Sequence, residues 1–148
     1  MSERYEKVTG IPKTDLAYID KIGLEPFLNP LEIERKAKIL LEANVGEATR
    51  EFVEDTDQFV YFLIGAINWR KRDYDGKKPG MGFDFGNPRT AARLALSSYK
   101  GALGEINSVS NVKVKDAAEF VSSSLEKYIN TDLDNVLKYF DDKLSLKH

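Results

Sequence analysis

The chain has 148 residues, of which 42% are apolar and 31% are charged, and its formal net charge is −2. At this length a chain buries roughly 68–70% of its unfolded surface, and the apolar content argues against intrinsic disorder. The sequence has no cysteine and its only histidine is His148, which excludes disulfide scaffolds, cysteine nucleophiles and thiolate metal sites and removes most histidine chemistry. We therefore expect one soluble helical domain over residues 1–148.

Residues 1–28 predict a short first helix, over residues 14–22, and then an extended arm. Residues 26–28 of this arm should lie across the bundle that the later helices form. The start of the chain has no apolar core of a signal peptide, and the longest apolar stretch, residues 59–67, is far shorter than the roughly 20 residues that cross a bilayer. We expect an intracellular protein that does not enter the membrane.

The dipeptide Asn-Pro occurs at Asn29-Pro30 and at Asn87-Pro88, and each time it predicts the start of a helix. An asparagine side chain can accept hydrogen bonds from the first turn, and a proline in the first helical position loses no donor that the helix needs. The first of these two helices should span residues 30–43.

The longest predicted helix covers residues 47–72, because apolar side chains recur there at helical spacing around more than half of the circumference. It should form the centre of the fold. Its expected buried side chains are Phe52, Val53, Phe59, Val60, Leu63, Ile64 and Ile67. The remaining polar stripe consists of Arg50, Glu54, Asp57, Tyr61, Asn68 and Arg72.

Three more helices are expected after Asn87-Pro88. The first ends near residues 107–108, the second begins at about Val114 with residues 122–124 partly outward, and the third begins after Thr131 as its cap. No strand pattern remains. The fold class is therefore all-α, a bundle of five or six helices around the helix at 47–72. The broad apolar arc of that helix and the rings of Tyr99, Tyr128, Tyr139 and Phe140 also favour burial between subunits.

Residues 73–87 form the longest predicted loop, and loops of this length in a compact domain are usually functional or disordered. It holds four glycines, one proline and three aromatic residues. The glycine spacing G-x-G-x-x-x-G is one residue longer than the dinucleotide-binding motif, and no strand precedes it. The P-loop pattern is also missing, so a nucleotide-binding fold is not expected.

Positive charge is concentrated between residues 70 and 100, which include eight basic and three acidic residues. The net charge of this segment is +5, and that of the rest of the chain is −7. Phosphate groups are the expected ligands of such a patch, and aromatic rings beside it could stack on unpaired bases. The predicted nucleic-acid-binding residues are the cations Arg70, Lys71, Arg72, Lys77, Lys78, Arg89, Arg93 and Lys100 and the rings of Tyr74, Phe83 and Phe85. On the helix after Pro88, three of the cations share one ridge.

These observations predict a non-enzymatic subunit of a larger nucleoprotein assembly, which holds a nucleic-acid backbone, RNA or DNA, without reading its sequence. Contacts with other protein subunits or with further copies of the chain are expected too. One alternative is a protein-interaction module whose basic and aromatic patch binds an acidic partner. The plainest alternative is that the lysines only solvate a loop.

Glu51 and Asp55, one helical turn apart, support a second functional alternative, an enzyme that uses carboxylates and a hydrated magnesium ion. Acids in the first turns of a helix are more simply explained by the helix dipole. We therefore expect no cofactor and no bound metal.

Overall fold

The computed structural model describes residues 18–21, 23–74 and 88–145. The elements are α2 (Tyr18–Lys21), η2 (Pro26–Leu28), α3 (Pro30–Ala43), α4 (Glu47–Tyr74), α5 (Pro88–Asn107), α6 (Val112–Asn130) and α7 (Leu133–Ser145). Within those ranges there is no strand, so the predicted all-α class is confirmed. Each helix in the same ranges is too short or too polar to cross a bilayer.

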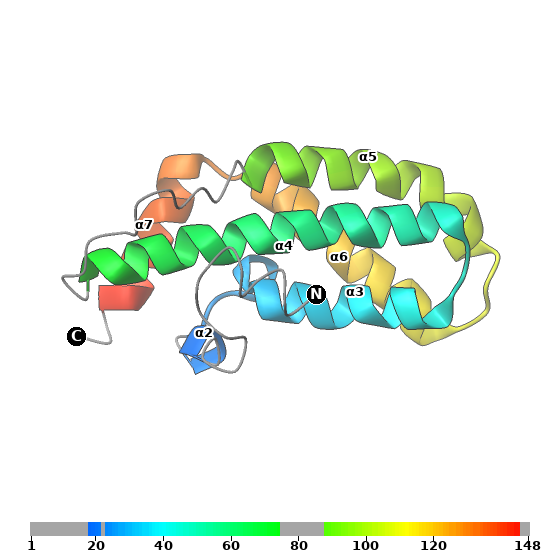
Figure 1. Ribbon diagram of the computed structural model, residues 1–148, viewed down its shortest axis with the longest axis horizontal. Helices are drawn as coiled ribbons and strands as arrows, with labels where there is room; N and C mark the ends of the chain where they lie inside the picture. The colour runs from blue at the N-terminus through cyan, green and yellow to red at the C-terminus, as the bar shows by residue number, and fades with distance from the viewer. Residues whose placement is uncertain (1–17, 22, 75–87, 146–148) are drawn as a thin grey trace.

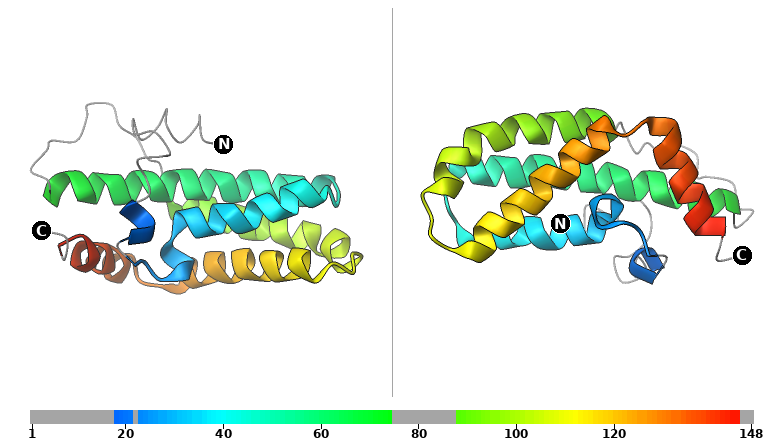
Figure 2. Two further views of the ribbon diagram at one scale, coloured as in Figure 1. Left: turned by 90° about the horizontal axis from the view of Figure 1, so that it is seen from below. Right: turned by 180° about the vertical axis from the view of Figure 1, so that it is seen from behind.

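Helices α3, α4, α5 and α6 form an antiparallel four-helix bundle, as Figure 1 and the two views of Figure 2 show. Helix α4 packs against α3 on one side and α5 on the other, and α6 closes the ring between α3 and α5. At 28 residues α4 is about 42 Å long, against about 30 Å for the 20 residues of α5. Its C-terminal end therefore extends past the start of α5, where α7 packs against it. The predicted central helix is confirmed.

The predicted cap at Asn29 is confirmed, because its side-chain oxygen accepts hydrogen bonds from the backbone N–H groups of Leu31 and Glu32 at 3.0 and 3.3 Å. At the other end of α3, Asn44 adopts a left-handed conformation with φ of 51°. Asparagine tolerates that region better than most residues, so the chain turns there into α4.

The apolar arc predicted for α4 is buried in full, and Phe52, Phe59 and Leu63 have no exposed surface. Phe59 meets the ring of Tyr128 edge to face at 5.1 Å between centroids, which joins α4 to α6 across the core. Among the residues of the predicted polar stripe whose side chains the structure describes, Asp57 differs. Asp57 is only 8% exposed, because the bundle encloses α4 more widely than the apolar arc alone indicates.

All four aromatic residues considered for a subunit interface have partners inside the chain. Tyr128 and Phe140 are buried, and Tyr99 packs on Phe52 with 5.2 Å between ring centroids. The Tyr139 hydroxyl accepts a hydrogen bond of 2.6 Å from the backbone N–H of Glu25, which ties α7 to the arm.

The arm differs from the extended form that we expected. Residues Pro26–Leu28 form the 3-10 turn η2, which packs against α6 and α3. A proline in its first position fixes φ near the helical value, which favours a tight turn over an extended strand. Of the predicted first helix, Tyr18–Lys21 is helical, and the other positions lie outside the described residues.

Helix α6 begins two residues before the predicted start, because Asn111 caps it through a hydrogen bond from the Lys113 backbone N–H. Ser122 and Ser124 were expected partly outward but are buried. Their hydroxyls donate to the carbonyl oxygens of Glu119 and Phe120, so both side chains enter the packed face without an unpaired polar group.

The predicted cap at Thr131 is wrong by one residue. Thr131 ends α6, and its hydroxyl donates to the Lys127 carbonyl oxygen at 2.6 Å. The carboxylate of Asp132 caps α7 instead, by accepting a hydrogen bond of 3.0 Å from the backbone N–H of Asp134. An aspartate is as good a cap as threonine, so the local sequence did not separate the two.

Candidate functional site

Helix α5 carries three of the eight cations that the sequence analysis singled out, Arg89, Arg93 and Lys100, and contacts at its two ends hold it in place. Glu105, in its last turn, reaches the N-terminus of α4, and Arg89, in its first turn, reaches the C-terminus of α6. A negative charge at a helix N-terminus and a positive charge at a C-terminus both complement the helix dipole. Helix α5 therefore links three helices of the bundle electrostatically.

The carboxylate of Glu105 accepts hydrogen bonds from the backbone N–H groups of Ala48 and Thr49, at 3.3 and 2.8 Å, and from the Thr49 hydroxyl at 2.9 Å. The hydrogen bonds from Thr49 are the main cause that lowers the pKa of Glu105 below its ordinary value. Gly46 leaves room for this contact, because a Cβ there would lie 2.3 to 2.5 Å from the carboxylate atoms.

Arg89 was predicted to bind phosphate. The structure places its guanidinium against the end of α6, where the two terminal nitrogens donate to the carbonyl oxygens of Ile129 and Thr131 at 2.5 and 2.9 Å. The last carbonyls of a helix lack partners within the helix, and Arg89 supplies them. It has a structural role in this fold, and its phosphate contact stays a prediction.

Arg93 and Lys100 are exposed on the outer side of α5. Neither forms an ion pair with any residue that the structure describes. The three cations of α3 differ in this respect: Arg35 pairs with Asp20 and Glu32, Lys36 with Glu32, and Lys38 with Glu42. The positive charge of α5 is therefore less neutralised than that of α3.

The remaining predicted binding residues cannot be placed in full. The backbone of Arg70, Lys71, Arg72 and Tyr74 belongs to the last turns of α4, but their side chains are not among those described. Lys77, Lys78, Phe83 and Phe85 lie outside the described residues.

The carboxylates considered for a metal do not form a larger cluster. Asp55 accepts a hydrogen bond from the Ser98 hydroxyl of α5, and Glu51 is exposed. In the part of the chain that the structure describes, no three acidic, histidine or cysteine residues are placed to share an ion.

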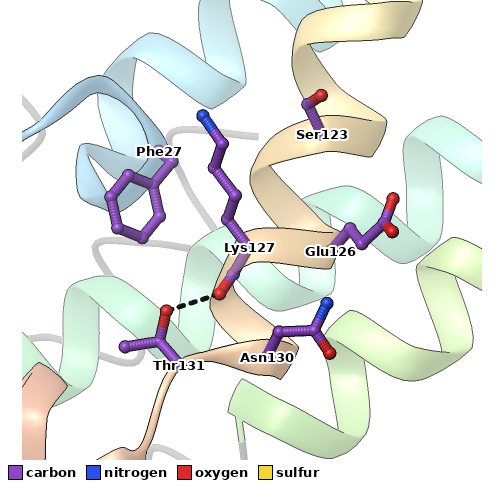
Figure 3. A pocket seen from close by; sticks show the side chains of 6 residues that line it. All are labelled: Phe27, Ser123, Glu126, Lys127, Asn130 and Thr131. Atoms are coloured by element: carbon purple, nitrogen blue, oxygen red, sulfur yellow. Dashed lines mark hydrogen bonds between the residues drawn. The ribbon is translucent and has the colours of Figure 1, made fainter.

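A cleft that the sequence analysis missed lies between η2 and the last two turns of α6. Its volume is about 580 Å³, and its lining consists of Phe27, Ser123, Glu126, Lys127, Asn130 and Thr131. Figure 3 shows Phe27 on one side and Glu126 and Asn130 extending on the other. The Lys127 ammonium lies 5.8 Å from the centroid of the Phe27 ring, within cation–π distance. Phe27 and Lys127 are 100 positions apart, so no local pattern marks this cleft.

One residue that lines the cleft, Glu126, can be placed relative to α5. Arg89 contacts Ile129 and Thr131, and α5 and α6 run antiparallel (Figure 2). One turn further along α5 is Arg93, and one turn back along α6 is Glu126, so these two residues lie at the same level of neighbouring helices.

No protein-family model, curated protein or solved structure gives a significant match to this chain.

Proposed function

We propose that the chain is a non-enzymatic, intracellular helical subunit of a nucleoprotein assembly, and that it holds a nucleic-acid backbone along the outer side of α5. The observation that carries this proposal is the exposure of Arg93 and Lys100 without an ion-pair partner among the described residues. Cations of this kind gain binding free energy when phosphates replace their counterions, because the condensed ions on the nucleic acid are released.

The spacing of the two cations suits a backbone. Arg93 and Lys100 are seven positions apart, which is close to two full turns, so both side chains lie on one side of α5 about 10 Å apart along its axis. This distance equals the rise of about three base pairs along the axis of B-form DNA. Contacts to phosphates position a nucleic acid without reading its sequence, so we expect little sequence preference.

The rigidity of α5 supports the same proposal. Glu105 and Arg89 fix its two ends to α4 and α6, so the two cations keep their spacing when the ligand is absent. The cations near the end of α4 and in residues 75–87 would extend the patch, as the sequence analysis predicts.

The test compares two charge reversals that change the net charge equally. R93E/K100E alters the proposed site, and K38E/K113E alters exposed lysines on α3 and α6. Binding of fluorescent 20-nucleotide DNA and RNA at about 50 mM salt should weaken about tenfold or more in the first variant and little in the second. Equal losses in both variants would contradict a local site.

The protein-binding alternative has one observation in its favour. Leu94, next to Arg93, is 56% exposed, and an apolar side chain beside cations also fits an acidic protein surface. Oligonucleotide binding separates the two functions. If no probe binds at about 50 mM salt, the nucleic-acid proposal fails and the protein-binding alternative is favoured.

A further inference from the structure

We propose that the cleft between η2 and α6 takes up an unpaired base of a single-stranded nucleic acid. This inference rests on the proposed function, because it adds a base contact to the backbone contacts of α5. If the inference holds, the nucleic acid that binds along α5 is single-stranded where it passes α6.

The dimensions of the cleft suit a nucleotide. Its volume of about 580 Å³ falls within the range of roughly 300 to 1,000 Å³ that is usual for small-molecule sites. It is open to solvent, so a base attached to a continuous strand can enter without the chain ends passing through it.

Phe27 supplies a surface for stacking. Its ring is half-buried, and the Lys127 ammonium lies over it at 5.8 Å from the centroid. The Lys127 side chain is exposed and flexible, so a base can occupy the ring face while the ammonium turns to the phosphate of the same nucleotide. Stacking of bases on aromatic rings tolerates any sequence, since every base has a flat face.

The opposite side of the cleft offers hydrogen-bonding groups. Ser123, Glu126 and Asn130 are exposed there, and none of their side chains bonds to another residue in the described ranges. The Glu126 carboxylate decides which part of a nucleotide is favoured. It repels a phosphate but accepts a hydrogen bond from a base amino group, and the Asn130 amide can both donate to and accept from a base edge.

The position of the cleft connects it to the proposed backbone site. Glu126 lies at the level of Arg93 on the neighbouring helix, as the contacts of Arg89 with the end of α6 establish. A strand that places a phosphate on Arg93 and then crosses toward α6 would bring its next bases to the cleft. In a duplex those bases are paired and stacked, and the cleft cannot receive them.

The test uses F27L, which keeps an apolar side chain against α6 but removes the flat ring. Three fluorescent 20-nucleotide DNA probes are compared: a mixed-sequence single strand, its duplex, and a strand of the same length with abasic positions. F27L should weaken binding of the single strand about tenfold and leave duplex binding unchanged. The wild-type protein should bind the abasic strand about as weakly as F27L binds the normal strand.

Duplex binding also shows whether F27L is folded and whether the α5 site works. If F27L and the wild-type protein bind the single strand equally while R93E/K100E weakens all probes, the cleft proposal is overturned and the proposed function stands. If the wild-type protein binds none of the probes, both proposals fail.

Discussion

Glu105 caps the first turn of α4 by accepting two hydrogen bonds from Thr49, one from its backbone N–H at 2.8 Å and one from its hydroxyl at 2.9 Å. The two residues are 56 positions apart. This contact fixes the end of α5 against the start of α4, and with the Arg89 contact at the other end it holds the proposed binding surface rigid.

The first prediction compares two buried threonines of α4. Thr49 bonds to Glu105, whereas the Thr56 hydroxyl is buried without a hydrogen-bond partner among the described residues. T49V should lower the free energy of unfolding by about 0.5–1.5 kcal/mol, and T56V should leave it unchanged or raise it by up to about 1 kcal/mol. Both variants replace a hydroxyl by a methyl group of similar size, and urea denaturation measures both changes. A loss of stability in T56V equal to that in T49V would contradict this account of the two hydroxyls.

The Glu105 contact should also make stability depend on acidic pH. Because hydrogen bonds from Thr49 lower the pKa of Glu105, its stabilising effect is complete above the ordinary value of 4.5 and is lost as pH falls through the lowered pKa. E105Q keeps an acceptor oxygen but has no titrating charge. The thermal midpoint of the wild-type protein should exceed that of E105Q at pH 7, and the difference should shrink below pH 4. A constant difference across this range would show that the charge has no part in the cap.

Tyr128 provides the corresponding prediction at alkaline pH. Burial raises its pKa to about 12, so ionisation of this hydroxyl opposes folding. The raised pKa means that the stability is complete below pH 10 and is lost as pH rises toward 12. In urea denaturation, Y128F should gain stability relative to the wild-type protein over this interval, by up to about 2–3 kcal/mol. Parallel pH profiles for the two proteins would count against a buried, neutral Tyr128.

Arg89 and Arg93 should have separable roles. R89M removes two charged hydrogen bonds to the end of α6 and should lower the free energy of unfolding by about 1–3 kcal/mol. R93M removes an exposed side chain without a described partner and should change it by less than about 0.5 kcal/mol. Oligonucleotide binding should be weakened more by R93M than by R89M. If R89M were as stable as R93M and bound oligonucleotides more weakly than R93M, the main role of Arg89 would be to bind phosphate. This result would contradict its structural role.

The features that the sequence predicts correctly depend on neighbouring residues. The Asn29 cap acts two and three residues along the chain, and the buried arc of α4 follows from helical spacing alone. The prediction that Thr131 caps α7 also depends on neighbouring residues, and it failed. Asp132 is adjacent and accepts the capping hydrogen bond from the Asp134 backbone N–H instead.

The features that the sequence did not predict depend on contacts between distant helices. Arg89 donates hydrogen bonds to carbonyl oxygens 40 and 42 residues away, and the Phe27 ring lies beside the Lys127 ammonium in the cleft between η2 and α6. A pattern of residue types along the chain contains no information about such pairs. The direction of Ser122 and Ser124 depends in the same way on how α3 and α5 enclose α6.

The most direct measurement is the salt dependence of duplex DNA binding by the wild-type protein and by R93Q/K100Q, between about 50 and 200 mM salt. Each phosphate contact contributes about 0.9 to the slope of log affinity against log salt concentration. If Arg93 and Lys100 each hold a phosphate, the slope of the variant should be smaller in magnitude by about 1.8. Between about 50 and 200 mM salt, the factor by which the variant loses affinity should then be roughly ten times smaller than the factor for the wild-type protein. Equal slopes for the two proteins would contradict a nucleic-acid backbone site on α5.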